Sequence, residues 1–394
     1  MIRVGVLIPF LTELFNLLVV KYMGVSMPKD IILFESYPYF SGNPLELFRE
    51  LLRRGYGNNY CMMWTVACGD SHKYKFPTIP YIGANEQYKK SILQSTKLII
   101  DSNQFIHKVP GVYRIHTQHG CSFKRCQEYY NNIGDVDAII TTSDDMKRVD
   151  EQSWPSYCKS KFIITGLPSN DRLFHPNKQN LHLLLQSMGY DQIPSKLVAW
   201  LPTYRQHRWS NKLTNHKYPY GLPLIQTSDE FTRLNQYLAS NDFVLLIQMH
   251  HAQANNYCQL SNMSNVKFVW QSLKDKFAVT TADILGASDA LITDYSSAYH
   301  EYIILNRPIA LTIDDFNEYS KSVGFLYDYH DWISGHPCNR LANLYDFLDN
   351  VLGGVDPYIN DRLRSLRKIH KYIDDQSTNR VINFLEQQHI ITKG

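Results

Sequence analysis

Residues 288–312 read SDALITDYSSAYHEYIILNRPIALT, and their pattern is the strongest indication of the fold in this sequence. A short apolar run, Ala290–Thr293, precedes a helical pattern over Ser297–Leu305, and a second apolar run, Ile309–Thr312, follows it. A strand, a helix and a strand in this order form a βαβ unit, whose two strands lie parallel in one sheet. The stretch therefore predicts an α/β protein built on parallel strands.

The same alternation extends outward over most of the chain. The other strand candidates are Ile31–Glu35, Cys61–Val66, Leu98–Asp101, Tyr113–Thr117, Ala138–Thr142, Phe162–Thr165, Leu197–Leu201, Phe243–Met249 and Val266–Val269. Helical patterns between them include Pro44–Arg54, Asn85–Gln94, Asp144–Gln152, Ser228–Leu238 and Thr281–Ala287. The chain has 394 residues, and single cores stop growing at about 250–300 residues. We therefore expect two parallel-sheet domains in tandem.

The domain boundaries are placed where the sequence contains no strand candidates. We expect a first domain over residues 29–180, a second over 190–340 and a helical tail over 341–394 that can cross back over the first domain. Ligands of open α/β sheets bind beyond the carboxyl ends of the strands. Two such sheets that face one another place the expected active site in the cleft between them.

The composition narrows the class of protein. The formal net charge is only +3 and no basic block occurs, which argues against nucleic-acid binding. The seven cysteines are scattered and form no CxxC pair, so we expect reduced thiols and a cytoplasmic location. The sequence leaves the oligomeric state open.

The N-terminal residues 1–28 pose a separate question. The run Val4–Val20 is apolar but is interrupted by Pro9, Thr12, Glu13 and Asn16. It is short for a spanning helix of about 20 residues, and it lacks the basic start and cleavage site of a signal peptide. We expect a helix on the inner membrane surface; the alternative is a helix packed against the first domain.

The first cluster with chemical potential is Thr117–Gly120, at the end of an expected strand. His119 can act as a general base, because its unperturbed pKa lies near physiological pH. Gly120 allows a ligand close to the backbone, and Lys124 adds a positive charge nearby. The alternative is a structural histidine at a strand end.

Four side chains around this point are of types that bind metals: His116, His119, Cys121 and Cys126. Strand alternation points the two histidines to opposite faces, so we expect no metal site. We also expect no cofactor.

Two further clusters follow strands. Gly166, Asn170 and Asp171 lie in a turn-rich segment, which taken alone is an ordinary loop. Thr203 and Arg205 open the second domain, where the guanidinium can clamp a phosphate; taken alone, a surface arginine is equally ordinary.

The last cluster belongs to the opening stretch. Asp294, Ser296 and Ser297 lie between a strand and a helix, where hydroxyls and free backbone N–H groups suit a pyrophosphate. The alternative is a helix cap without a ligand. The strand Phe243–Met249 ends at His250, a second imidazole that faces the same cleft if the strands are parallel.

In series, these segments resemble the CDP-glycerol:poly(glycerophosphate) glycerophosphotransferase family, which comprises teichoic acid primases and polymerases. The resemblance is carried by Leu33–Ser36 with Asn43-Pro44, His119-Gly120-Cys121-Ser122-Phe123-Lys124, Thr165–Leu173, Pro202–Arg205, Gln248-Met249-His250, Ser288–Ile309 and Phe316–Gly335. It covers residues 30–340 in the family's order, and its most specific part is Thr293–Ser297.

The resemblance implies a GT-B-like architecture of two Rossmann-like domains, with the acceptor side first and the nucleotide side second. It implies that His119 is the general base, that His250, Ser296 and Ser297 bind the donor phosphates, and that Arg205 and Asp294 border them. The implied partners are a CDP-polyol donor and a surface-polymer or lipid-linked acceptor at the inner membrane surface, where the enzyme is peripheral. The implied reaction transfers glycerol or ribitol phosphate and releases CMP.

Two departures leave the donor open. The family often has arginine where this chain has Ser169, and a lysine or arginine where it has Gln248. The alternatives are therefore a GT-B glycosyltransferase that uses a nucleotide sugar for capsule or lipopolysaccharide, and a non-catalytic scaffold of polymer assembly. The retained His119 and His250 argue against the scaffold.

Overall fold

The computed structural model describes residues 30–68, 70, 77–103, 106, 110–121, 123–125, 136–153, 161–190, 194–203, 218–249 and 263–393. The helix expected over residues 1–28 lies outside these ranges. Within them, no helix is long and apolar enough to cross a membrane.

The first domain is a seven-stranded sheet in the order β3-β2-β1-β4-β5-β6-β7. Its strands are β1 (Ile31–Glu35), β2 (Cys61–Ala67), β3 (Thr78–Ile82), β4 (Thr96–Asp101), β5 (Tyr113–His116), β6 (Ala138–Thr141) and β7 (Lys161–Ile164). All neighbouring pairs are parallel, with Glu35 opposite Asp101 and Asp101 opposite His116 in the register. Polar residues thus end three adjacent strands at one edge.

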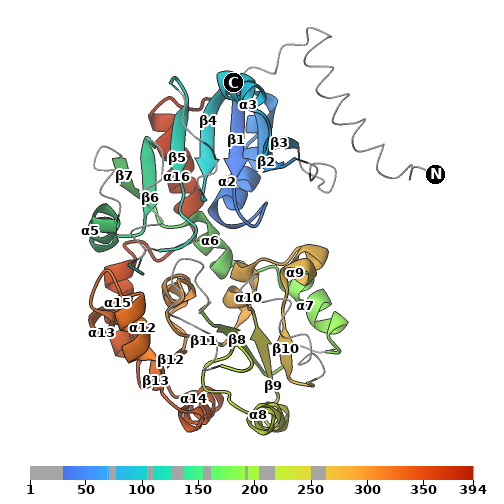
Figure 1. Ribbon diagram of the computed structural model, residues 1–394, viewed down its shortest axis with the longest axis vertical. Coiled ribbons are helices and arrows are strands. Elements are labelled where there is room, and N and C mark those ends of the chain that lie inside the picture. The colour runs from blue at the N-terminus through green and yellow to red at the C-terminus, as the bar shows by residue number, and fades with distance from the viewer. Residues whose placement is uncertain are drawn as a thin grey trace, which may run out of the picture.

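The second domain is a six-stranded sheet in the order β10-β9-β8-β11-β12-β13. Its strands are β8 (Lys196–Leu201), β9 (Phe243–Ile247), β10 (Val266–Phe268), β11 (Ala290–Thr293), β12 (Ile309–Thr312) and β13 (His336–Cys338). All are parallel. The two-sheet α/β architecture that the sequence predicts is therefore confirmed, and Figure 1 shows one sheet above the other.

Helices connect and cover the strands. Those of the first domain and the link are α2 (Gly42–Arg53), α3 (Glu86–Gln94), α5 (Asp144–Ser153), α6 (Pro168–Phe174) and α7 (Lys178–Ser187). Those of the second domain are α8 (Ser228–Ser240), α9 (Gln271–Phe277), α10 (Thr281–Ala287), α11 (Ala298–Tyr302), α12 (Phe316–Ser322) and α13 (Tyr329–Trp332). Short 3₁₀ turns at Tyr56–Asn58 and Ile303–Leu305 follow α2 and α11, respectively.

The C-terminal region is helical, as expected, and comprises α14 (Leu341–Gly353), α15 (Ile359–Ile369) and α16 (Ser377–Gln387). α16 packs against α2 and α6, while α15 packs against α5 and α13. Between them, Thr142 Oγ1 donates to the carbonyl of Ile369 at 2.6 Å, and His370 Nε2 donates to the carbonyl of His300 at 2.5 Å. The tail therefore ties both domains together.

The apolar cores explain why the two domains hold one arrangement. One buried cluster is continuous across them and joins Leu167 and Leu173 beside the first sheet to Leu285 and Tyr299 of the second domain. Two smaller clusters fill the outer faces, one for each sheet. Burial of apolar surface, the largest stabilising contribution to folding, thus acts across the junction as well as within each domain.

Candidate active site

His119 lies two residues beyond Thr117, where the chain leaves β5. Thr117 N–H donates to the carbonyl of Asp101 at 2.7 Å, which fixes the exit of the strand. The Nδ1 atom of His119 lies 3.2 Å from the carbonyl oxygen of Ser102. Because a carbonyl only accepts, Nδ1 carries the proton, and Nε2 of the neutral ring keeps a lone pair. The side chain is open to solvent, so this lone pair can take a proton from a ligand.

The surroundings keep the ring neutral. Partial loss of hydration between protein walls, followed by the positive charges of His116 and Lys124, lowers the pKa of His119 below its ordinary value, against the opposing effect of the Ser102 hydrogen bond. His116 itself is buried and contacts Asp101. His119 is therefore suited to accept a proton at neutral pH.

Asn43 at the start of α2 fixes the loop that carries His119. Its Nδ2 donates to the carbonyls of Thr117 and Gln118 at 2.8 and 3.0 Å. Its Oδ1 accepts from the backbone N–H and the hydroxyl of Ser169 at 2.9 and 2.8 Å. Asn43 is 2 % exposed. One buried amide thus joins the segment before His119 to the segment before α6.

Gly120 brings the two domains into contact at the site. Its φ is +151°, and a Cβ atom there would lie 2.7 Å from Ser297 Oγ and 3.8 Å from Glu301 Oε1. The carboxyl edge of the first sheet therefore meets the carboxyl edge of the second, as the sequence predicts for a site between facing sheets. Only glycine fits this approach, since any Cβ would overlap the serine.

The hydroxyls of Ser296 and Ser297 have different local roles. Ser296 Oγ accepts from the backbone N–H of Ala298 at 3.3 Å. Ser297 Oγ has no hydrogen-bond partner within the described ranges and makes no cap on α11. Both side chains are half-buried. Ser297 contacts Gly120, the residue that follows His119. Its hydroxyl can therefore bind a ligand beside His119 at the junction of the two domains.

Glu301 is a site residue that the sequence reasoning missed. It lies one turn after Ser297 on α11, and its carboxylate approaches Gly120. Loss of hydration raises the pKa of Glu301 to about 7. The sequence does contain a signal that could have identified Glu301. Its carboxylate lies four residues after the candidate Ser297, and this spacing places both side chains on one helix face.

Thr203 and Asp294 lie together, but they bind one another. Asp294 accepts from the Thr203 backbone N–H at 2.9 Å and from its hydroxyl at 2.5 Å, and from the Tyr295 backbone N–H at 2.6 Å. Both side chains are buried. They therefore hold the carboxyl ends of β8 and β11 in register, and a direct role in binding a donor stays a prediction.

Lys124 lies in a segment that crosses between the domains. It forms an antiparallel bridge with Phe325, and Arg125 N–H donates to the Gly324 carbonyl at 3.1 Å. The ring of Phe123 stacks on that of Phe325, with centroids 5.6 Å apart. The segment that follows His119 is thus anchored on the second domain, which holds the lysine charge near the histidine.

The loop residues of the second cluster contact the C-terminal helix. Asp171 accepts from the backbone N–H groups of Ser377 and Thr378 at 2.9 and 2.7 Å, which caps the start of α16. A Cβ at Gly166 would lie 2.4 Å from Ser377 Oγ. Asn170 is 1 % exposed, and its side-chain amide has no hydrogen-bond partner among the described residues. These contacts give Gly166 and Asp171 structural roles, and their predicted place in the binding site stays a prediction.

Two of the expected residues, Arg205 and His250, lie outside the described residues. Their roles stay predictions. Among the described residues, no three His, Cys, Asp or Glu side chains are grouped closely enough to hold a metal ion.

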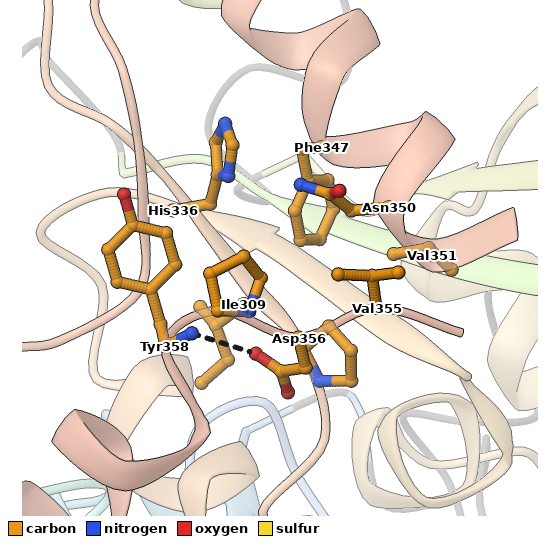
Figure 2. Close-up of a pocket in the computed structure, with 10 residues that line it drawn as sticks. Ile309, His336, Phe347, Asn350, Val351, Val355, Asp356 and Tyr358 are labelled. Atoms are coloured by element: carbon orange, nitrogen blue, oxygen red, sulfur yellow. Dashed lines mark hydrogen bonds between the residues drawn. The ribbon is translucent and has the colours of Figure 1, made fainter. Parts of the chain in front are cut away.

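Two cavities lie at the opposite ends of the sheets. Figure 2 shows one where β12 and β13 begin, lined by Ile309, His336 and Tyr358, with a volume of about 10 Å³. That volume holds about one water molecule. An open depression of about 380 Å³ lies where β5 and β6 begin, beside Tyr113 and Asp137. Because the polar clusters all follow carboxyl ends of strands, neither cavity is the site.

Comparison with known proteins gives a consistent result. The sequence profile of the family described as CDP-Glycerol:Poly(glycerophosphate) glycerophosphotransferase matches residues 18–387. A teichoic acid glycerol-phosphate transferase of Staphylococcus aureus is 21% identical over 90% of this chain and 92% of its own length. A teichoic acid ribitol-phosphate polymerase, TarL, of the same organism is 29% identical over 58% of this chain and 37% of its own.

Among solved structures, the wall teichoic acid polymerase TagF superposes with a TM-score of 0.71 at 17% identity, over 98% of both chains. At that identity the match shows a common fold. It agrees with the arrangement of two parallel sheets that face one another across His119 and Ser297.

Proposed function

This chain belongs to the CDP-glycerol:poly(glycerophosphate) glycerophosphotransferase family, and on that premise we propose that it transfers glycerol phosphate from CDP-glycerol to a hydroxyl of a teichoic-acid-like polymer or its lipid-linked precursor. The observation that carries the proposal is the geometry of His119. Its Nδ1–H is held by the Ser102 carbonyl, its Nε2 has no hydrogen-bond partner among the described residues, and it lies beside the contact of Gly120 with Ser297.

The proposed reaction is an in-line displacement at phosphorus. The acceptor oxygen attacks the β-phosphorus of the donor, and its proton passes to Nε2 of His119. The bond from that phosphorus to the oxygen bridging to CMP breaks, and CMP leaves with the electron pair. A positioned base of this kind contributes a factor of about 10²–10⁴ in rate.

Groups of the second domain would stabilise the charge that develops on the phosphoryl oxygens. Ser297 Oγ has no partner within the described residues and can donate a hydrogen bond, and Ser296 lies beside it. Lys124 is a cation of the same junction, with Arg205 and His250 as further expected ligands. Donors fixed before the reaction usually contribute more than the base does. Thr203 and Asp294 would act indirectly by holding the strand ends.

The membrane assignment forms part of the proposal. A lipid-linked acceptor requires the enzyme to work at a membrane surface, so we place it on the inner face of the cell membrane as a peripheral protein. Residues 1–28 would supply the contact. A chain truncated before Lys29 would then lose its association with vesicles while it keeps turnover of a soluble acceptor.

The test is the release of CMP with purified enzyme and membrane extract as acceptor. We expect release from CDP-glycerol, with CDP-ribitol as the competing polyol donor and UDP-sugars as controls. Release from CDP-ribitol alone would change the transferred unit but keep the reaction. Turnover of a UDP-sugar alone would contradict the proposal and assign a glycosyltransferase.

A further inference from the structure

A buried lysine lies at the same edge of the second sheet as the proposed donor site. Lys274 on α9 is 6 % exposed, and its Nζ donates to Thr281 Oγ1 at 3.0 Å. The same hydroxyl lies 3.1 Å from Oε1 and 3.0 Å from Nε2 of Gln248. Three side chains, one just after β9, one on α9 and one on α10, therefore form one connected cluster.

The charge of Lys274 is not neutralised within the described part of the chain. It forms no ion pair there, and the carboxylate of the next residue, Asp275, accepts instead from Gln271 Nε2 at 2.8 Å. Burial lowers the pKa of Lys274 to about 8, with only a small opposing effect of Asp275. A buried ammonium without a carboxylate is costly. A protein can keep such an ammonium group where a bound ligand supplies the hydrogen-bond acceptors.

The position of the cluster relates it to the donor. Gln248 follows β9, Thr203 follows β8 and Asp294 follows β11, and these three strands are neighbours in one parallel sheet. Their ends therefore share one edge, with Gln248 two strand spacings, about 10 Å, from Asp294. An extended nucleotide whose diphosphate lies at Ser296 and Ser297 would place its base at this distance. In Figure 1, α9 and α10 flank the end of the second sheet that faces the first domain.

We infer that Lys274, Thr281 and Gln248 form a subsite that reads the pyrimidine ring of the nucleotide donor and selects cytosine over uracil. The inference rests on the proposed function, because it takes the diphosphate position from it.

The selectivity follows from hydrogen-bond chemistry. Lys274 occupies one lone pair of the Thr281 hydroxyl, whose hydrogen can then go to Gln248 Oε1. Gln248 Nε2 donates to the same Thr281 oxygen at 3.0 Å. The groups that remain for a ligand are therefore the other N–H groups of Lys274 and the second N–H of Gln248 Nε2, all of them donors. Cytosine presents two adjacent acceptors, N3 and O2. Uracil carries a hydrogen on N3, which would face these donors without a partner.

The experiment compares the binding of CMP and UMP by calorimetry to the full-length protein and to Lys274→Met. Methionine keeps the length of the side chain and removes its charge and donors. We expect the wild type to bind CMP at least about tenfold more tightly than UMP, as one well-placed base contact discriminates, and Lys274→Met to lose most of this ratio. Gln248→Met should lose it as well. Lys276→Met, an exposed lysine on the same helix, should keep it.

The nucleotide-binding measurements test the base subsite independently of the proposed transfer reaction. An unchanged CMP-to-UMP ratio in Lys274→Met, or an equal loss of affinity for both nucleotides, would overturn base reading. Failure of the wild type to bind either nucleotide would also overturn it. CMP release from CDP-glycerol, measured in parallel, reports on the proposed function alone. A preference for CMP that depends on Lys274 would support the subsite even without turnover of CDP-glycerol.

Discussion

A histidine that accepts a proton needs one nitrogen fixed and the other free, and His119 meets both conditions. The Ser102 carbonyl fixes Nδ1, and the side chain is open to solvent. We predict that His119→Ala lowers turnover at least about a hundredfold and leaves the affinity for the donor nearly unchanged, because the base contacts the acceptor. Steady-state kinetics of CMP release would separate the two effects. Wild-type turnover in the variant would remove His119 from the mechanism.

The pH dependence of the wild type offers an independent check on His119. Its pKa is lowered below 6.5, so the neutral, active form persists as the solution becomes mildly acidic. The acid limb of the pH–rate profile should therefore lie below pH 6.5 and should be absent from the residual rate of His119→Ala. An acid limb above pH 6.5 would assign the base to another group.

Glu301 makes a prediction about stability. Its carboxyl has a folded-state pKa of about 7 against an ordinary 4.5, so the folded state holds the proton more tightly than the unfolded state. The wild type therefore loses stability as the pH rises from 4.5 through 7. We expect Glu301→Gln to match the wild type at pH 4 and to exceed it by about 2 kcal/mol at pH 8, a value reduced because the side chain is partly exposed.

Urea unfolding at a series of pH values would measure this difference. Glu318→Gln replaces an exposed carboxylate on α12 and should show no such trend. A constant difference between Glu301→Gln and the wild type across the range would show that Glu301 ionises normally.

At the residue scale, sequence reasoning could select His119 and Ser297 but not their proximity. Both follow strands, and the rule that ligands bind at carboxyl ends places each at an edge of its own sheet. The contact of Gly120 with Ser297 depends on how two domains pack, which no local pattern encodes. Glu301 was missed for the same reason, since a carboxylate on a helix is ordinary until packing removes its water.

At the scale of elements, the start of α2 has a role that its helical pattern conceals. Asn43 connects the loop of His119 to Ser169 through hydrogen bonds to three residues. Asn43→Ala would leave two buried carbonyls and one N–H without partners. We expect a loss of about 2–4 kcal/mol in unfolding free energy and a lower turnover, because the loop loses its anchor.

Asn59→Ala is the matched control for Asn43, since it removes an exposed amide just beyond the 3₁₀ turn that follows the same helix. Chemical denaturation and CMP release would be measured for both variants. An Asn43→Ala protein as stable and active as the control would show that the loop is fixed by other contacts.

The strands that sequence reasoning missed share a physical cause. β3 (Thr78–Ile82) and β13 (His336–Cys338) are edge strands, and each contains a proline, Pro80 and Pro337. Proline removes a backbone donor and weakens the strand pattern, and it is tolerated at an edge because one side has no partner strand. The central strands are apolar and buried, so their sequence pattern was sufficient to predict them. The other two edge strands, β7 and β10, contain no proline, and their patterns predicted them.

At the scale of the whole molecule, the packing of α6 against α10 sets how the domains face one another. A Cβ at Gly286 would lie 2.5 Å from the carbonyl oxygen of Leu173, which is backbone and cannot rotate away. Beside it, Arg172 Nε donates to Asp283 Oδ1 at 2.6 Å. The glycine therefore permits the close approach, and the ion pair holds its direction.

We predict that Gly286→Ala forces α6 and α10 apart and shifts Ser297 relative to His119. Overpacking of this kind costs about 1–3 kcal/mol, and a displacement of about 1 Å at reacting groups can reduce turnover a hundredfold. Turnover should therefore fall by a factor larger than the loss of stability explains. Gly353→Ala, where a Cβ would meet only Val355 Cγ2 at 3.8 Å, should change neither quantity.

The Gly286→Ala measurement pairs CMP release with thermal unfolding of both variants, and the affinity for CMP shows whether the second domain is intact. Because the nucleotide is expected to bind that domain alone, its affinity should stay within about twofold while turnover falls. That combination would locate the damage in the arrangement of the domains. If affinity and turnover fell together, the substitution would have disturbed the second domain itself, and the contact of α6 with α10 would not control the site.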